Sequence, residues 1–117
     1  MHQPDIRYLH LYPSQDSVRS GEPLNVMFAV KNMETAVCEA ELRLWLSGTG
    51  GWRLASAAVR ELAGRSITHV YMQIAAQAFL PDFWDGQQQE ELLLYCGFAA
   101  PTGEPSKNCT ALIFVKS

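Results

Sequence analysis

The chain has 117 residues, of which 48% are hydrophobic and 18% charged, and its formal net charge is -3. This is the composition of one globular domain rather than of a disordered chain. The sequence holds no basic stripe of the kind that binds nucleic acid, and no run of about 20 apolar residues that would insert into a membrane.

Alternation of apolar and polar residues predicts β-strands through most of the chain. In Ala40–Leu46, for example, leucine stands at every second position from Leu42 onward, and charged or aromatic residues separate the leucines. Successive side chains of a strand point to opposite faces, so this pattern is typical of a strand with one face in a core. The predicted strands are Ile6–Tyr12, Leu24–Lys31, Val37–Leu46, Trp52–Val59, Ser66–Ile74, Glu90–Phe98 and Thr110–Lys116.

Two of these regions are also rich in good helix formers, namely Glu39–Leu46 and Arg53–Gly64. In Glu39–Leu46 a helix would scatter the leucines around its surface, which favours a strand, whereas for Arg53–Gly64 a helix stays an alternative. Seven short strands at this spacing predict an all-β, immunoglobulin-like antiparallel β-sandwich that forms a single domain over residues 1–117. The predicted core is Leu9, Leu11, Leu24, Val26, Phe28, Val30, Leu42, Leu44, Leu46, Val70, Met72, Ile74, Leu92, Leu94, Phe98, Ile113 and Val115.

The order of motifs between Val18 and Ile74 is similar to that of a known group of modules. A Val-Arg-Ser-Gly-Glu-Pro-Leu-Asn-Val stretch leads into a strand that ends in Asn32, and Leu62-Ala-Gly-Arg-Ser66 precedes a later strand. This half of the chain resembles bacterial cell-adhesion-related (CARDB-type) and fibronectin-III-like immunoglobulin-fold modules, whereas the second half departs from their pattern. The resemblance implies a sandwich that serves as a spacer or a binding module, and it transfers no active site.

One group of apolar residues is predicted to lie outside the core. If Val37–Leu46, Glu90–Phe98 and Thr110–Lys116 share a sheet, aromatic and aliphatic side chains gather on its outer face, and such a patch usually marks an interface. We therefore expect a non-enzymatic module that binds a protein partner or a second copy of itself. Alternatively, the 75–89 connection covers this face with its own apolar side chains, Phe79, Leu80, Phe83 and Trp84. The expected contact residues are Trp45, Leu93, Tyr95, Leu112 and Phe114.

A second candidate site is the segment Phe83-Trp84-Asp85-Gly86. Aromatic rings can stack on sugar rings while a neighbouring carboxylate binds the hydroxyls, so Phe83 and Trp84, with Trp52 as a second platform, predict an alternative function in carbohydrate binding. Loop aromatics of this kind also commonly plug the end of their own sandwich. A third alternative is a structural spacer that binds no ligand.

The three cysteines, Cys38, Cys96 and Cys109, do not make a disulfide framework because their number is odd. A hairpin centred between Thr102 and Gly103 would place Cys96 opposite Cys109. A cross-strand disulfide is then possible in geometry, although two buried free thiols are favoured. Cys38 is expected to be a plain core residue.

Catalysis and cofactor binding are not indicated by any motif in the sequence. His2, His10 and His69 lack the spacing of metal ligands, and no Cys-x-x-Cys pair, cofactor loop or activated nucleophile can be identified. We therefore expect no enzymatic activity, no metal and no cofactor. Residues 1–12 do not resemble a signal peptide, so the sequence is compatible with a complete cytoplasmic protein or with a module of a longer extracellular or cell-surface protein.

Overall fold

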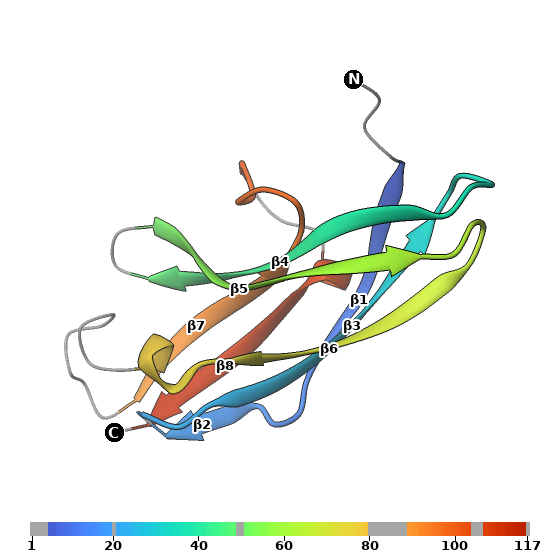
Figure 1. The fold of residues 1–117 in the computed structure, drawn as a ribbon. Coiled ribbons are helices and arrows are strands. Elements are labelled where there is room, and N and C mark those ends of the chain that lie inside the picture. Colours follow the sequence, from blue (N-terminus) through green and yellow to red (C-terminus); the bar gives the residue numbers. More distant parts are fainter. Residues whose placement is uncertain (1–4, 20, 49–50, 80–88, 104–106, 117) are drawn as a thin grey trace.

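The structure is a computed structural model that describes residues 5–19, 21–48, 51–79, 89–103 and 107–116. In these ranges two β-sheets pack face to face as an immunoglobulin-like sandwich (Figure 1), which confirms the predicted fold class. The described strands are β1 (Ile6–Pro13), β2 (Ser17–Arg19), β3 (Leu24–Asn32), β4 (Cys38–Gly48), β5 (Gly51–Leu62), β6 (Ile67–Ile74), β7 (Gln89–Cys96) and β8 (Thr110–Lys116). Two short 3-10 turns, η1 (Ala76–Phe79) and η3 (Lys107–Cys109), complete the elements described below.

The smaller sheet has the strand order β1-β3-β6, and the larger sheet has the order β2-β8-β7-β4-β5. Neighbouring strands are antiparallel except for β2, which pairs in parallel with β8. The strand β2 is not among the predicted strands, because three residues are too few for an alternation to be recognised. It lets the N-terminal part of the chain contribute to both sheets.

The region for which a helix was the alternative forms the edge strand β5. Its pairing with β4 runs from Cys38 opposite Leu62 to Gly48 opposite Gly51, with a register shift at Leu44/Trp45. The helical alternative for Arg53–Gly64 is therefore wrong. Continuous pairing with β4 outweighs the helix propensity of the alanines and arginines, because propensity is a weak preference that tertiary context overrides.

Alternate side chains from the two sheets form the core between them, as predicted. Fifteen of the seventeen predicted positions are buried, from Leu11 in β1 to Val115 in β8. Leu9 is an exception, because a register shift between Tyr8 and His10 moves it to a half-buried position. Phe98 is the other, since β7 ends at Cys96 and Phe98 packs beside the core against Tyr8, with 5.1 Å between the ring centroids.

One buried amide holds an end of the sandwich together. Asn32, the last residue of β3, is fully buried, and it is the one buried polar residue in the described ranges. Its Nδ2 donates hydrogen bonds to the carbonyl oxygens of Ala36 (2.9 Å) and Leu62 (3.2 Å), and its Oδ1 accepts one from the backbone N–H of Glu34 (3.0 Å). Because Leu62 ends β5 in the larger sheet, this side chain connects the two sheets directly.

The turns beside Asn32 also contact each other through their backbones. The N–H of Arg65 donates to the carbonyl oxygen of Glu34 at 2.8 Å, and the N–H of Asn32 donates to that of Ser66 at 3.1 Å. At Gly64 the two chains approach so closely that a Cβ atom would collide with the carbonyl oxygen of Thr35. The β3–β4 and β5–β6 turns therefore form one hydrogen-bonded unit.

Replacing Asn32 by alanine is expected to lower the free energy of unfolding by about 3 kcal/mol, because one buried and two partly buried backbone groups would lose their hydrogen-bond partner. Urea unfolding measures this loss. Asn25→Ala, at an exposed position of the same strand, is the matched control and should change stability by less than about 0.5 kcal/mol. Equal effects of the two substitutions would contradict the role given to Asn32.

Candidate functional site

The outer face of the larger sheet carries a continuous group of apolar side chains, which we call the outer patch. The strands β4, β7 and β8 do lie in one sheet, and their pairing brings together the five residues predicted from the sequence. Trp45 lies opposite Tyr95, and Leu93 lies opposite Leu112. Strand β5 adds two more residues, since Leu54 lies opposite Trp45 and Trp52 lies opposite Ser47. The outer patch comprises Trp45, Trp52, Leu54, Leu93, Tyr95, Leu112 and Phe114.

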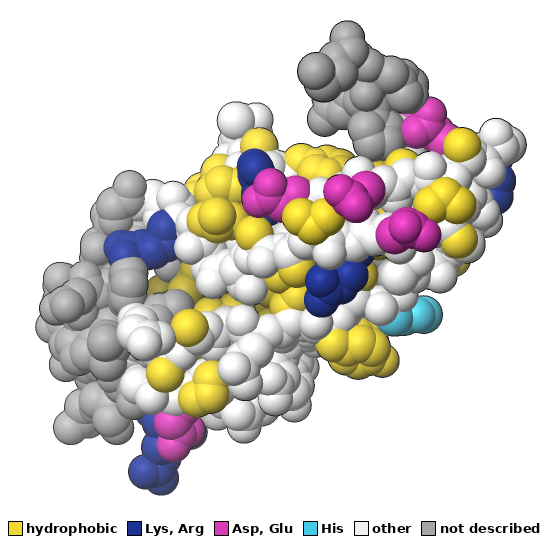
Figure 2. All heavy atoms as spheres, in the orientation of Figure 1, with side chains coloured by type: hydrophobic (Ala, Val, Ile, Leu, Met, Phe, Trp, Pro, Cys, Tyr) yellow, Lys and Arg dark blue, Asp and Glu magenta, His cyan; other side chains and the backbone are white. Residues whose placement is uncertain are grey.

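The exposure of these side chains contrasts with that of their neighbours in sequence. Leu93 is 38% exposed and Leu112 is 43% exposed, whereas Leu94 and Ile113 are completely buried. Leu54 is 50% exposed, and the aromatic members of the patch are half-buried. Figure 2 shows hydrophobic side chains gathered along the upper edge of the molecule, above β4 and β5 of Figure 1, with acidic side chains beside them.

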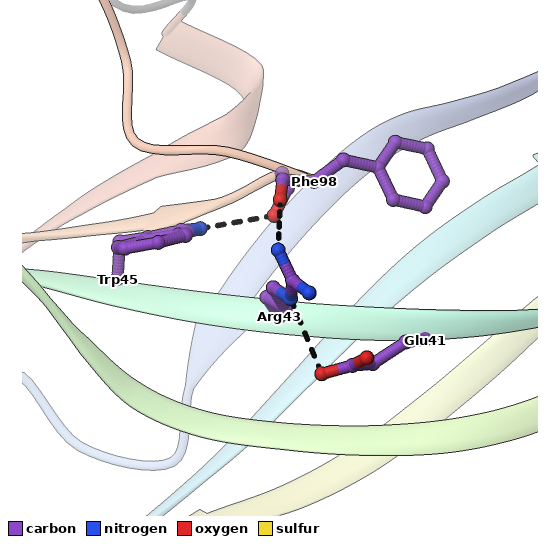
Figure 3. A network of polar contacts seen from close by, with 5 residues as sticks. Glu41, Arg43, Trp45 and Phe98 are labelled. Atoms are coloured by element: carbon purple, nitrogen blue, oxygen red, sulfur yellow. Dashed lines mark hydrogen bonds and ion pairs between the residues drawn. The ribbon is translucent and has the colours of Figure 1, made fainter.

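Two side chains of β4 connect the outer patch to the segment that follows β7 (Figure 3). The indole Nε1 of Trp45 donates a hydrogen bond to the carbonyl oxygen of Gly97 at 3.0 Å, and the Arg43 guanidinium donates one to that of Phe98 at 2.9 Å. The same guanidinium forms an ion pair with Glu41 at 3.2 Å. The tryptophan predicted as a binding anchor is thus also a structural residue, with its polar atom bonded inside the protein.

A glycine lets the aromatic residues of the patch lie close to the sheet. A Cβ atom at Gly97 would overlap the ring of Tyr95, so that ring lies across the position where another residue would have a side chain. The same ring contacts Trp52, with 6.1 Å between the centroids. The Tyr95 hydroxyl, whose ordinary pKa of 10.0 already leaves it neutral at physiological pH, has this pKa raised further by partial burial. The result is an uncharged and rigidly supported surface.

The segment predicted to bind sugars or to cover the outer patch is described only at its beginning. Phe79, in η1, is completely buried in the core, and its carbonyl oxygen accepts a hydrogen bond from the N–H of Gly21 at 3.3 Å. The side chain of Phe79 therefore fills the interior of the sandwich and does not lie on the outer patch. Leu80, Phe83 and Trp84 lie outside the described residues, and Trp52 belongs to the outer patch.

The hairpin register predicted for the cysteine pair is confirmed. Tyr95 lies opposite Thr110 in the last pair between β7 and β8, and Cys96 and Cys109 are the residues directly beyond this pair. Both are free thiols, and the Sγ of Cys109 donates a hydrogen bond to the carbonyl oxygen of Tyr8 at 3.3 Å. Cys38 is free as well and half-buried against the core.

The described residues hold neither a candidate metal cluster nor a helix fit to cross a membrane. In the part of the chain that the structure describes, no group of three or more histidine, cysteine, aspartate and glutamate side chains is arranged to hold a metal ion. Within the same ranges, no helix has both the length and the apolar character that a membrane crossing requires.

Comparison with known proteins identifies the fold. No protein-family model matches the sequence, and no curated protein matches it. Among solved structures, a β-glucosidase from Erythrobacter marinus is similar with a TM-score of 0.71 and 13% identity, over 96% of this chain and 15% of that one. β-Glucosidase 3B from Thermotoga neapolitana gives 0.68 and 16% identity, over 97% of this chain and 16% of its own. A β-glucosidase from Listeria innocua gives 0.67 and 14%, over 97% and 16%.

At these identities the similarity shows a shared fold alone. The chain spans about a sixth of the length of the β-glucosidases that it matches, as the covered shares of 15% and 16% show. A sandwich of this kind therefore occurs there as a small part of a much longer chain.

Replacing Trp45 by phenylalanine is expected to cost about 1 kcal/mol of stability, because it removes the indole donor from the Gly97 carbonyl and keeps an aromatic ring. The measurement is urea unfolding, monitored by circular dichroism. Trp52→Phe is the matched control on the same face, and a loss of the same size there would contradict the proposed importance of the hydrogen bond.

The buried thiol predicts a stability that depends on pH. Burial, and secondarily the neighbouring Cys109, raises the pKa of the Cys96 thiol above its ordinary value of 9.0. Above about pH 9 the folded chain keeps the proton on the Cys96 thiol, whereas the unfolded chain releases it. The free energy of unfolding therefore falls as the pH rises above about 9, and Cys96 contributes at most about 1.4 kcal/mol per pH unit to this fall.

Cys96→Ala should make this decline less steep in the reduced protein, although it lowers stability at neutral pH. Urea unfolding between about pH 8 and pH 10 measures the slope. The pKa of Cys38 is also raised, but Cys38 is not fully buried, so Cys38→Ala serves as a comparison with a smaller expected effect. An unchanged slope in Cys96→Ala would contradict the assignment.

Proposed function

We propose that this chain is a non-enzymatic interaction module that binds another protein surface through the outer patch. The observation that carries the proposal is the continuity of Trp, Tyr and Leu side chains across four strands, outside a core that is already complete. A monomeric soluble domain rarely exposes such a surface without using it.

The composition of the patch supports a protein partner. Tryptophan and tyrosine are enriched at the centres of protein interfaces, and the charged Glu41 and Arg43 stand beside the patch, where a polar rim is expected. Exposed leucines at positions 54, 93 and 112 provide apolar area that could be buried by association.

The support given to the aromatic rings also favours binding. Trp45 is held by its hydrogen bond to Gly97, and Tyr95 lies over the same glycine and contacts Trp52. Rings that are already positioned lose little conformational entropy when a partner binds. The fold similarity, limited to about a sixth of each β-glucosidase, supports a role as a module and carries no glycosidase activity to this chain.

The double substitution of Leu93 by glutamate and of Leu112 by lysine tests the proposal, because these two residues lie opposite each other and opposite charges avoid repulsion between the strands. If the patch is a free surface, the free energy of unfolding should change by less than about 1 kcal/mol, whereas Leu94→Ala in the core should cost about 2 to 5 kcal/mol. A loss as large as that of Leu94→Ala would overturn the proposal, because it would mean that the chain itself covers the patch.

Light scattering over a range of concentrations then distinguishes a second copy from a different protein as the partner. Self-association should be lost in the double variant and kept in Val59→Glu, the matched control, because Val59 is 54% exposed on the same sheet but outside the patch. If the wild-type chain is monomeric at every concentration measured, self-association is excluded and a different protein is the partner.

A further inference from the structure

The opposite side of the sandwich contains an open hollow on the outer face of the smaller sheet. Its volume is about 450 Å³, and the residues that matter for its chemistry are Tyr12, Ser14, Asn25, Met27, Tyr71 and Gln73. They come from β1, β3 and β6 and from the residue that follows β1. Because this face points away from the larger sheet, the hollow is separate from the outer patch.

Two tyrosines stand on either side of the hollow. Tyr12 and Tyr71 both lie opposite Met27 in the central strand β3, one on each side, so their backbones are two strand spacings, or about 10 Å, apart. Tyr12 is 53% exposed and Tyr71 is 72% exposed, so neither ring is needed to fill the core. The ring of Tyr12 stacks on that of His10, with 5.9 Å between centroids and 28° between planes, which restrains it.

Polar groups form the neighbouring row of the same face. Asn25 lies opposite Gln73, and Nε2 of Gln73 donates a hydrogen bond to Oδ1 of Asn25 at 3.2 Å. That bond holds the two exposed amides in place and uses one donor and one acceptor, so Asn25 Nδ2 and Gln73 Oε1 can still bind a ligand. The hydroxyl groups of Ser14 and of the two tyrosines add further donors and acceptors.

The combination of aromatic rings, amides and hydroxyls, without a charged residue in the lining, points to a neutral ligand with many hydroxyl groups. A sugar ring presents apolar C–H faces that pack on tyrosine rings and equatorial hydroxyls that bind amides. A phosphate or a carboxylate would need a cation, and none lines the hollow. We propose that this hollow is a binding site for a neutral saccharide of one or two units.

The rest of this face argues against a protein as the occupant. Next to the tyrosine row lies a row of His10, Ala29 and His69, and beyond it a row with Arg7, Lys31 and Ile67. Large apolar side chains are therefore isolated among small, polar and cationic ones, unlike in the outer patch. Protein interfaces need about 800 Å² per partner around an apolar centre, and this face does not offer such a centre.

Titration of the full chain with glucose and with the disaccharide cellobiose tests the proposal, with NMR as the readout. We expect the side-chain amide signals of Asn25 and Gln73 to shift in a saturable way at millimolar sugar, and the signals of the outer patch to stay unchanged. Tyr71→Ala should weaken binding by about tenfold, the amount that one aromatic contact contributes. Ile67→Ala, at a 53% exposed position of the same strand and face, is the matched control and should bind as the wild type does.

Three results would overturn the proposal. The first is the absence of any shift at these amides with either sugar, and the second is a shift that is equally strong in Tyr71→Ala. The third is a shift of the same signals with protein concentration alone, which would assign the hollow to self-association. The variants that test the outer patch lie on the other sheet. A negative result for sugar binding would therefore leave the proposed protein-binding function untouched, and a negative result for the outer patch would leave the saccharide site untouched.

Discussion

Burial of alternate side chains between the two sheets is the constraint on which the rest of this structure depends. Leu44, Leu46 and Leu94 are at most 1% exposed, and the residues directly next to them in β4 and β7 point outward. Because the side-chain period of a strand is two, a slip of one residue in β4 or β7 would exchange the core with the outer patch. The same condition that stabilises the fold therefore places the aromatic residues on the outside.

Polar contacts at two places complement this apolar core. At one end Asn32 joins β3 to β5 through buried hydrogen bonds, and the turns beside it bond to each other. Elsewhere, Arg43 and Trp45 hold the segment after β7 by its carbonyl oxygens. Such bonds add little stability when made but cost much when broken, so they select one arrangement of the strands. The two outer faces that result differ in chemistry: one carries the apolar outer patch with charged residues beside it, and the other is mostly polar with two exposed tyrosines.

Local alternation was sufficient to predict the fold class and most of the core, and, once three of the strands were assumed to share a sheet, five of the seven members of the outer patch. It did not indicate β2, which is too short for a pattern, or the register shift that moves Leu9 out of the core. Nor did it reveal that Leu54 and Trp52 join the patch, since this depends on β5 pairing with β4. The hollow between Tyr12 and Tyr71 was missed for the same reason: the two residues are far apart in the chain, and only the pairing of both strands with β3 brings them together.

The central claim is that the core is complete without the outer patch, which remains accessible in the folded monomer. Hydroxyl-radical footprinting of the full chain at low protein concentration, read by mass spectrometry, tests this most directly. The account predicts that Leu93 and Leu112 are modified readily while their neighbours Leu94 and Ile113 are protected until the chain unfolds. Equal protection of all four in the monomer would contradict it, because the outer patch would then be part of the core.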